Sequence, residues 1–234
     1  IRAGFAPICA DLYADLDLRQ QAGVTVHQIE NLDSAARQIA RLYPDIPRLY
    51  TGGLENHSQT VQTLEETGPL WGCAARQLQS LRSPFVLADC LRRENIPSLK
   101  LLPAAEPPPR DTGWLLKSTR STGGLGVRLW NQGCAQPTGS GWYFQQFQPG
   151  LSCSGQFLAT SAGPQLFAVM EQLIGCSPGC PSPFSYCGSI HWTDPPATLV
   201  QQLQRIAHAI WRLTAIRGLF GLDLLRPQEL FGLQ

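Results

Sequence analysis

The sequence predicts an α/β protein, with a parallel layer at its N-terminus and an α+β arrangement of antiparallel strands in the remainder. Two observations predict this. Within residues 1–72, short strand-like, loop and helix-like segments follow one another, which is typical of a parallel sheet covered by helices. From residue 113 onward, apolar runs are separated by turns that contain Gly or Pro, which is typical of antiparallel strands.

Composition limits the classes of function. The chain has 234 residues, of which 43% are hydrophobic and 15% charged, which is ordinary for a globular protein with a substantial core. A net charge of +1 gives no electrostatic basis for binding nucleic acid or an anionic membrane. No apolar run approaches the ~18 residues of a membrane span. The eight cysteines are scattered and fit reduced thiols, so we expect a cytoplasmic protein.

The first third has expected strands at 24–29 and 47–50 and expected helices at 31–42 and 58–66. Asp33 or Ser34 is the expected cap of the first of these helices. The loop 51–57 follows the carboxyl end of an expected strand, where parallel sheets bind ligands. It is therefore a candidate for substrate contact, although a well-capped turn explains the same residues equally well.

The remainder alternates helices and strands. Residues 73–95 read as helical, with Pro84 opening a second helix. Expected strands are 113–117, 126–130, 141–147, 154–160, 165–172 and the buried-looking 218–225. A long helix is expected after Asp194, its proposed cap, with one apolar face formed by Leu199, Leu203, Ile206, Ile210 and Leu213.

Two charged residues stand out because their neighbours are apolar. Lys117 follows Trp114-Leu115-Leu116, and Asp223 lies between Leu222 and Leu224. An unpaired buried charge costs several kcal/mol, so each residue needs a partner. A phosphate would satisfy Lys117 and a divalent cation would satisfy Asp223, so one magnesium–nucleotide would satisfy both.

The loop after Lys117 supports a phosphate site. In Ser121-Thr122-Gly123-Gly124-Leu125-Gly126, backbone amides can form an anion nest without side chains in the way. The order excludes a P-loop, a dinucleotide fingerprint and a protein kinase, because Lys117 precedes the glycines and the loop leads into a strand. A plain hairpin beside a lysine that extends toward solvent remains the structural alternative.

The order of these features resembles the ATP-grasp superfamily. The resemblance rests on the strand ending in Lys117, the glycine loop, the segment Phe144–Gly150, and a late helix followed by a strand bearing Asp223. It implies an ATP-grasp fold in which two lobes clamp ATP, preceded by an N-terminal α/β domain. The expected division is 1–72 for that domain, 73–98 for a helical connection, 99–147 for the lid and 148–234 for an incomplete C-terminal subdomain.

The resemblance also implies roles for particular residues, with ATP and Mg2+ as the cofactors. Lys117 would contact the phosphates, the loop glycines would cover them, and Asp223 would be the first magnesium ligand. Arg82 stands where many relatives have a second phosphate-binding residue. The remaining predicted ATP contacts are the loop residues Gly123, Gly124 and Gly126 and the hinge residues Gln145, Gln146, Phe147 and Gln148.

Three departures from the family pattern leave an alternative open. The usual hinge acid is Gln145 here, and the usual ribose-binding glutamate is Ser152. A second metal motif, glutamate followed two places later by asparagine, is expected after a strand at 230–234, where the given sequence ends. We therefore expect a fragment or trimmed chain. The alternative function is a nucleotide-binding or regulatory module without catalysis.

The implied reaction joins a carboxylate to an amine or a similar nucleophile through an acyl phosphate. Lys117 and the metal at Asp223 would neutralise the phosphoryl charge, with Arg120 and Arg226 as candidate catalytic helpers. Small-molecule carboxylates and amines are the expected partners, and a homodimer is left open. The pattern Thr51-Gly52-Gly53-Leu54-Glu55-Asn56-His57 resembles a bacterial subgroup linked to pterin-dependent one-carbon metabolism.

One cysteine cluster allows a second type of site. Cys176, Cys180 and Cys187, with His191 as a fourth ligand, would have the residue types of a zinc site. A Pro-rich loop with incidental thiols is the favoured interpretation.

Overall fold

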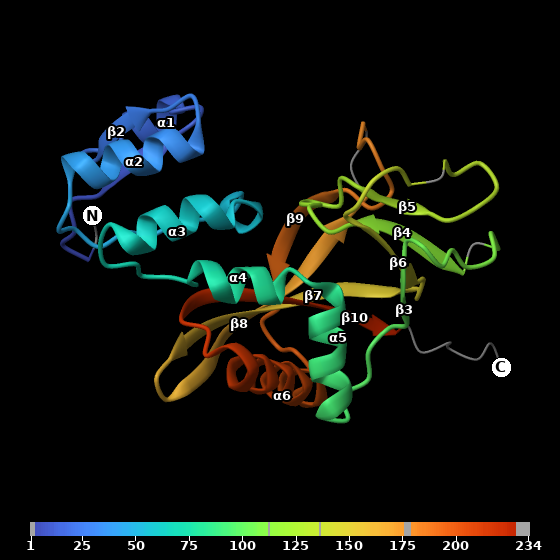
Figure 1. Ribbon diagram of the computed structural model, residues 1–234. Helices are drawn as coiled ribbons and strands as arrows, with labels where there is room; N and C mark the ends of the chain where they lie inside the picture. The colour runs from blue at the N-terminus through green and yellow to red at the C-terminus, as the bar shows by residue number, and fades with distance from the viewer. Residues whose placement is uncertain (1–2, 112, 136, 176–178, 228–234) are drawn as a thin grey trace. The chain divides into compact units, whose positions relative to one another are not determined.

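The computed structural model describes residues 3–111, 113–135, 137–175 and 179–227 (Figure 1). The chain divides into two compact units, Ile1–Arg76 and Gln77–Gln234.

The first unit contains a parallel pair of strands with helices. β1 (Ile8–Asp11) pairs with β2 (Thr25–Gln28) in parallel, with Ile8 opposite Thr25. This pairing confirms the parallel layer predicted for the N-terminal part. The other elements are α1 (Leu16–Arg19), α2 (Leu32–Leu42), the 3-10 helix η1 (Leu54–Asn56), α3 (Ser58–Glu66) and the start of α4 (Ala75–Leu81).

The start of α2 corrects one prediction. Asn31 is the cap, and its side-chain oxygen accepts hydrogen bonds from the amides of Asp33 and Ser34 at 2.9 and 3.1 Å. Both residues expected to cap the helix therefore belong to its first turn. Asp33 accepts a hydrogen bond from Thr60 of α3, so its carboxylate joins the two helices.

The strand expected at 47–50 is reduced to one parallel bridge between Arg48 and Leu70. Pro47 has no N–H to donate, which limits pairing on that side. The Arg48 side chain is buried, and its guanidinium donates to the Leu64 carbonyl at 3.0 Å. The Arg48 guanidinium therefore stabilises the first unit from inside.

The second unit begins with helices and a four-stranded antiparallel sheet. α5 (Pro84–Arg93) starts after Ser83, whose hydroxyl accepts from the Val86 amide, and Pro84 opens it as predicted. The sheet has the strand order β3-β6-β4-β5. Its strands are β3 (Leu101–Pro103), β4 (Trp114–Ser118), β5 (Val127–Leu129) and β6 (Trp142–Gln146). Leu116, Phe144 and Trp130 form its buried core.

A second antiparallel sheet has the order β10-β7-β8-β9. Its strands are β7 (Gly150–Thr160), β8 (Gly163–Ile174), β9 (Tyr186–His191) and β10 (Gly218–Pro227). One face packs on α6 (Ala197–Thr214), where Leu203 approaches Gly155 so closely that an added Cβ would lie 2.9 Å from it. β7, β8 and β10 extend past the predicted limits, and β1, β3 and β9 were not predicted. The strand expected at 230–234 lies outside the described residues.

The limits of α6 correct two further predictions. Pro196 is the N-cap, so Asp194 lies before the helix and does not cap it. Leu199, Leu203, Ile206 and Ile210 are buried as expected, but Leu213, in the last turn, is 44% exposed. The side chain of Gln77 donates to the carbonyls of Thr214 and Ala215 and satisfies this helix end.

No helix in the described part of the chain is both long and apolar enough to cross a membrane.

The packing of α6 can be tested with two leucines on one helix. Leu203→Ala should lower the free energy of unfolding by about 2–5 kcal/mol, because it leaves a cavity at a fully buried position. Leu213→Ala, the control, removes a half-exposed side chain and should cost less than about 1 kcal/mol. Urea denaturation followed by tryptophan fluorescence measures both. Equal losses would contradict this assignment of the buried face.

Candidate functional site

Lys117 lies near the end of β4, in partly buried surroundings. Its ammonium donates to Oε1 of Gln145 on the paired strand β6, at 3.2 Å, and lies 6.0 Å from the ring centre of Tyr143. Desolvation lowers the pKa of Lys117, and the negative charge of Asp223 opposes this shift. The lysine therefore has a neutral amide as its hydrogen-bond partner and lies within the electrostatic reach of a carboxylate.

Asp223 lies on β10, and its side chain points away from α6. The next residue back, Leu222, is buried, so strand alternation places the carboxylate on the opposite face. The strand predicted to be buried is therefore only partly buried, with Leu222 as its one buried residue. The side-chain amide of Gln172 on β8 donates to Oδ1 of Asp223 at 2.8 Å.

The environment of Asp223 disfavours its charge. Surrounding protein raises the pKa of this carboxyl by desolvation, and the Gln172 hydrogen bond and the charge of Lys117 partly offset the rise. Although Asp223 is exposed to water, the protein around it removes part of its hydration. An oxygen anion of this kind favours a cation as a ligand.

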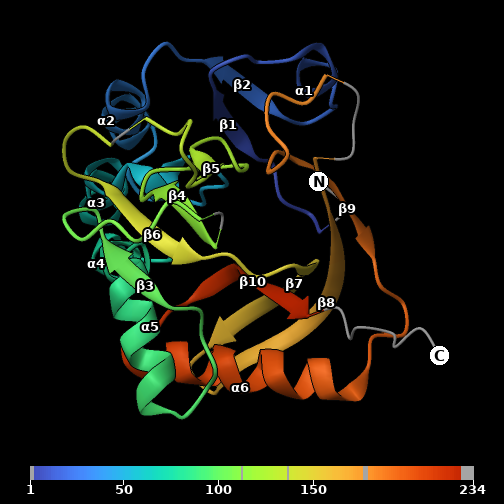
Figure 2. The same ribbon diagram turned by 90° about the vertical axis from the view of Figure 1, so that its right-hand side faces the viewer.

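Lys117 and Asp223 belong to different sheets and interact electrostatically. Both views show the sheet containing β4 and β6 on the side of the β7–β10 sheet that lies away from α6 (Figures 1 and 2). The two residues selected from the sequence for their costly charges therefore lie on two different sheets, within electrostatic reach of each other.

The glycine loop is a tight connection between β4 and β5. The amide of Ser118 donates to the carbonyl of Gly126 at 3.0 Å, and the amide of Val127 donates to the carbonyl of Gly124 at 3.3 Å. Gly123, Gly124 and Gly126 have φ values of 58°, 78° and 124°, a region that side chains rarely adopt. The predicted loop therefore forms with the backbone conformation that its glycines permit.

The connection from β8 to β9 packs directly on this loop. The amide of Tyr186 donates to the carbonyl of Gly123 at 3.0 Å. A Cβ added at Gly124 would overlap the carbonyl oxygen of Phe184. Two features therefore require glycine at position 124: the close approach of the Phe184 backbone and the positive φ.

The three predicted arginines have different surroundings. Arg82 donates from Nη2 to the carbonyls of Thr119 and Ser121, at 2.8 and 3.2 Å, so it braces the glycine loop from the side. Arg120 is exposed on that loop. Arg226 is exposed near the end of β10 and lies over the ring of Trp192, at 5.9 Å from its centre.

The predicted hinge follows β6, the central neighbour of β3 and β4. The amides of Gln146 and Phe147 donate to the carbonyls of Lys100 and Gly113, at 2.9 and 2.8 Å. Gln148 donates from its side chain to the Pro149 carbonyl at 3.3 Å. Ser152 is partly buried on β7, opposite Leu225 of β10. These backbone bonds leave fewer amides of the segment for a ligand than the sequence suggested.

Gln172 is the site residue that the sequence did not indicate. It lies in an expected strand, but nothing in its neighbours distinguishes it from a solvent-facing glutamine. Only the sheet order, with β8 separated from β10 by β7, shows that its amide reaches Asp223.

Within the described residues, no group of three or more His, Cys, Asp or Glu side chains could hold a metal ion. Cys180 and Cys187 lie close together, with their sulfur atoms 3.1 Å apart, but they do not form a three-ligand site with His191. Cys176 lies outside the described part of the chain. For magnesium, Asp223 supplies the type of oxygen ligand that this ion prefers, and nucleotide phosphates are its usual further ligands.

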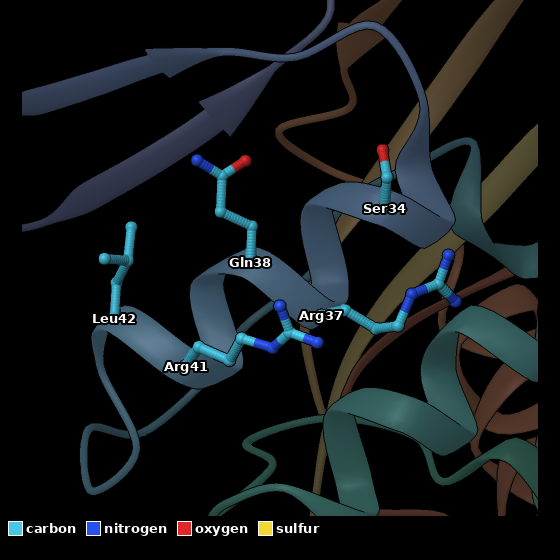
Figure 3. A pocket seen from close by; sticks show the side chains of 5 residues that line it. All are labelled: Ser34, Arg37, Gln38, Arg41 and Leu42. Carbon is cyan, nitrogen blue, oxygen red and sulfur yellow. The ribbon is translucent and has the colours of Figure 1, made fainter.

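In the first unit, the loop 51–57 contains η1, and the amide of Gly53 donates to the Glu55 carboxylate at 2.5 Å. A surface hollow of about 310 Å3 lies along α2, lined by side chains of that helix alone (Figure 3). Its lining residues are Ser34, Arg37, Gln38, Arg41 and Leu42. The hollow contains none of the predicted site residues.

Comparisons with known proteins identify the family and the fold. A family model described as an ATP-grasp domain matches residues 85–231. No curated protein matches significantly. The N5-carboxyaminoimidazole ribonucleotide synthetase of Thermus thermophilus has a TM-score of 0.71 at 16% identity, over 97% of this chain and 63% of that one.

Two further solved structures have the same fold. The biotin carboxylase domain of Hydrogenobacter thermophilus 2-oxoglutarate carboxylase, crystallised with MgADP and bicarbonate, gives a TM-score of 0.73 at 11% identity. It is matched over 97% of this chain and 57% of that one. The IMP biosynthesis protein PurP of Thermococcus kodakaraensis gives a TM-score of 0.68 at 15% identity. The match covers 97% of this chain and 76% of that one. The chain thus spans less than two thirds of the synthetase and of the biotin carboxylase domain.

Two adjacent glycines test the contact beneath the loop. Gly124→Ala should destabilise the second unit by at least about 2 kcal/mol, because the new methyl meets the backbone of Phe184 and the φ is strained. Gly123→Ala has a similar strain but nothing within 4 Å of its Cβ, so its cost should be about 1 kcal/mol. Thermal unfolding compares them. Equal losses would show that the approach of Phe184 does not constrain the loop.

Proposed function

The chain belongs to the ATP-grasp family, and from this premise we propose that it is an ATP- and magnesium-dependent ligase. It would join a carboxylate to an amine or a similar nucleophile through an acyl phosphate. The observation that carries the proposal is the pairing of Lys117 on β4 with Asp223 on β10, next to a glycine loop. A cation, an anion and a backbone nest around one space match the charges of a magnesium–nucleotide.

Lys117 would bind the phosphates. Its pKa is lowered by desolvation, and its hydrogen-bond partner Gln145 is neutral, so an added anion would stabilise the charged form. Gly123, Gly124 and Gly126 would cover the phosphates with backbone amides. Arg82 would act through the loop, because its Nη2 already donates to two loop carbonyls.

Asp223 would hold the magnesium ion, and Gln172 would orient the carboxylate for it. The Gln172 amide occupies Oδ1, which directs Oδ2 toward a ligand. When bound, the ion would supply charge neutralisation on the phosphoryl oxygens. This fits a carboxyl group whose charge is costly in the absence of a cation.

The segment after β6 would bind the adenine. Because the amides of Gln146 and Phe147 are used within the sheet, adenine recognition would fall to backbone carbonyls and to Gln148. Gln145 would position the Lys117 ammonium. Ser152, on the neighbouring strand β7, would contact the ribose.

The reaction would begin when a substrate carboxylate attacks the γ-phosphate, forming a new C–O–P linkage and releasing ADP. The amine would then attack the acyl carbon and expel phosphate. Positioning and charge neutralisation dominate such a step, so no protein nucleophile is needed. Lys117 would stabilise the transferred phosphoryl group, with Arg120 and Arg226 as candidates for contacting the carboxylate.

The solved neighbours support this class of chemistry. Their descriptions name synthetases and carboxylases, some crystallised with ATP, ADP or MgADP. The neutral Gln145 beside Lys117 also favours a second candidate, a nucleotide-binding module without catalysis. Phosphate release separates them, since the module would bind Mg-ATP without hydrolysing it in a screen of acids and amines.

The nucleotide site can be tested with the two lysines of the chain. Mg-ATP at about 100 times its Kd should raise the Tm of the wild-type protein by about 5–10 °C, from ~2.7 kcal/mol of added stability. Lys117→Ala should remain folded but lose most of this shift. Lys100→Ala, the exposed control, should retain it. A shift that survives in Lys117→Ala would remove Lys117 from the site.

The raised pKa of Asp223 predicts the direction in which protein stability changes with pH. Its raised pKa means that the folded state holds the proton more tightly than the unfolded chain, so stability falls as pH rises through that pKa. At pH 7, Asp223→Asn should therefore unfold at the same Tm as the wild type or at a higher one, yet lose the magnesium-dependent part of ATP binding.

Glu171→Gln removes an exposed carboxylate next to Gln172 on β8; it is the matched control and should keep magnesium dependence. Calorimetric titration with ATP, with and without Mg2+, measures the difference. The assignment would be contradicted if Asp223→Asn without ligand had a lower Tm than the wild type. It would also be contradicted if ATP binding by this variant kept its full dependence on magnesium.

A further inference from the structure

We propose that Cys180 and Cys187 are a reversible thiol-oxidation site, whose disulfide clamps the segment that supports the glycine loop. Their sulfur atoms lie 3.1 Å apart, close enough to bond after a small side-chain adjustment. The proposed ligase chemistry does not use this pair.

Local hydrogen bonds hold the two thiols near each other. Between them the chain turns through Ser182, whose carbonyl accepts from the Ser185 amide at 3.0 Å and whose hydroxyl accepts from the Phe184 amide at 3.1 Å. The Cys187 thiol donates to the Ser185 carbonyl at 3.4 Å. The Gly175 amide donates to the same carbonyl, at 2.7 Å, and ties the turn to the end of β8. The turn is therefore formed before any oxidation.

Cys180 and Cys187 are more accessible to an oxidant than most other thiols in the described part of the chain. Cys180 and Cys187 are partly exposed, whereas Cys73, Cys90 and Cys153 are buried. Burial raises the pKa of these three thiols, to about 11 for Cys73, which suppresses the reactive thiolate. Cys9 is also partly exposed but belongs to the first unit, so it serves as the comparison.

The oxidation balances with a peroxide as the oxidant. One thiolate attacks a peroxide oxygen, breaks the O–O bond and becomes a sulfenic acid while water leaves. The second thiolate attacks this sulfur, forms the S–S bond and expels the hydroxyl group as water. Two thiols and one hydrogen peroxide thus give one disulfide and two waters. An external dithiol reverses the step.

The disulfide would act on the glycine loop through contacts that already exist. The ring it closes contains Phe184, whose carbonyl lies against Gly124, and Tyr186, whose amide donates to the Gly123 carbonyl. Cross-linking the ends of this segment reduces its freedom to move away from the loop. The oxidised protein should therefore hold the loop more rigidly, whether or not it binds nucleotide.

The first test maps the bond. The full chain is treated with equimolar hydrogen peroxide and digested without reduction by an enzyme that cleaves after aromatic residues. Cleavage after Phe184 and Tyr186 separates Cys187 from Cys180, so the bond joins two peptides that dithiothreitol releases. Cys176→Ser removes the alternative partner and should keep the cross-link, and Cys187→Ser should abolish it. A bond to Cys176, sulfinic acids without a bond, or stoichiometric zinc that protects these thiols would overturn the proposal.

The second test measures the loop. Amide hydrogen exchange in residues 119–126 should slow at least threefold on oxidation of the wild-type protein, and should be unchanged in Cys187→Ser treated the same way. Cys9→Ser should behave as the wild type. A mapped disulfide without slower exchange would refute the clamp. Neither measurement requires ATP, so failure here is distinct from failure of the nucleotide site.

Discussion

Two desolvated charges of opposite sign organise the second unit. Lys117 and Asp223 each carry a charge that their surroundings disfavour, and each partly relieves the other across the space between two sheets. Among the described residues, their hydrogen-bond partners Gln145 and Gln172 are neutral amides, which orient the charges without cancelling them. Such an arrangement has the charges that the proposed magnesium–nucleotide would complement.

Packing on one side of the β7–β10 sheet decides where Asp223 lies. α6 covers one face of the β7–β10 sheet with Leu199, Leu203, Ile206 and Ile210, and strand alternation then places Asp223 on the other. The glycine loop is held by Arg82 on one side and by the backbone of residues 184–186 on another. Both supports contact backbone groups of the loop, so they do not depend on its side chains.

The sequence predicted the parts of this site that depend on local order. Lys117, the glycines and Asp223 could be recognised because a lone charge in an apolar run, or three glycines in four positions around one leucine, is locally unusual. α5 and most of α6 followed from Pro84 and from helical spacing. Gln172, the β9 strand and the approach of Phe184 to Gly124 could not be predicted, because each depends on residues that meet only after the strands pair. The wrong caps have two different reasons. At α2, Asn31 accepts the hydrogen bonds of the first turn in place of Asp33. At α6, the helix begins after Pro196, which makes no side-chain cap, so Asp194 lies outside the helix.

The meeting of Gly124 with the Phe184 carbonyl has an evolutionary consequence. The obstacle at Gly124 is main chain, which every amino acid shares, so no substitution at 184 can make room for a larger residue at 124. Substitutions in the β8–β9 connection therefore leave its contact with the glycine loop in place. An insertion or deletion in this connection, in contrast, moves the carbonyl at position 184. Among homologues, we expect insertions and deletions between β8 and β9 to coincide with altered spacing in the glycine loop, and plain substitutions to accumulate in each segment independently.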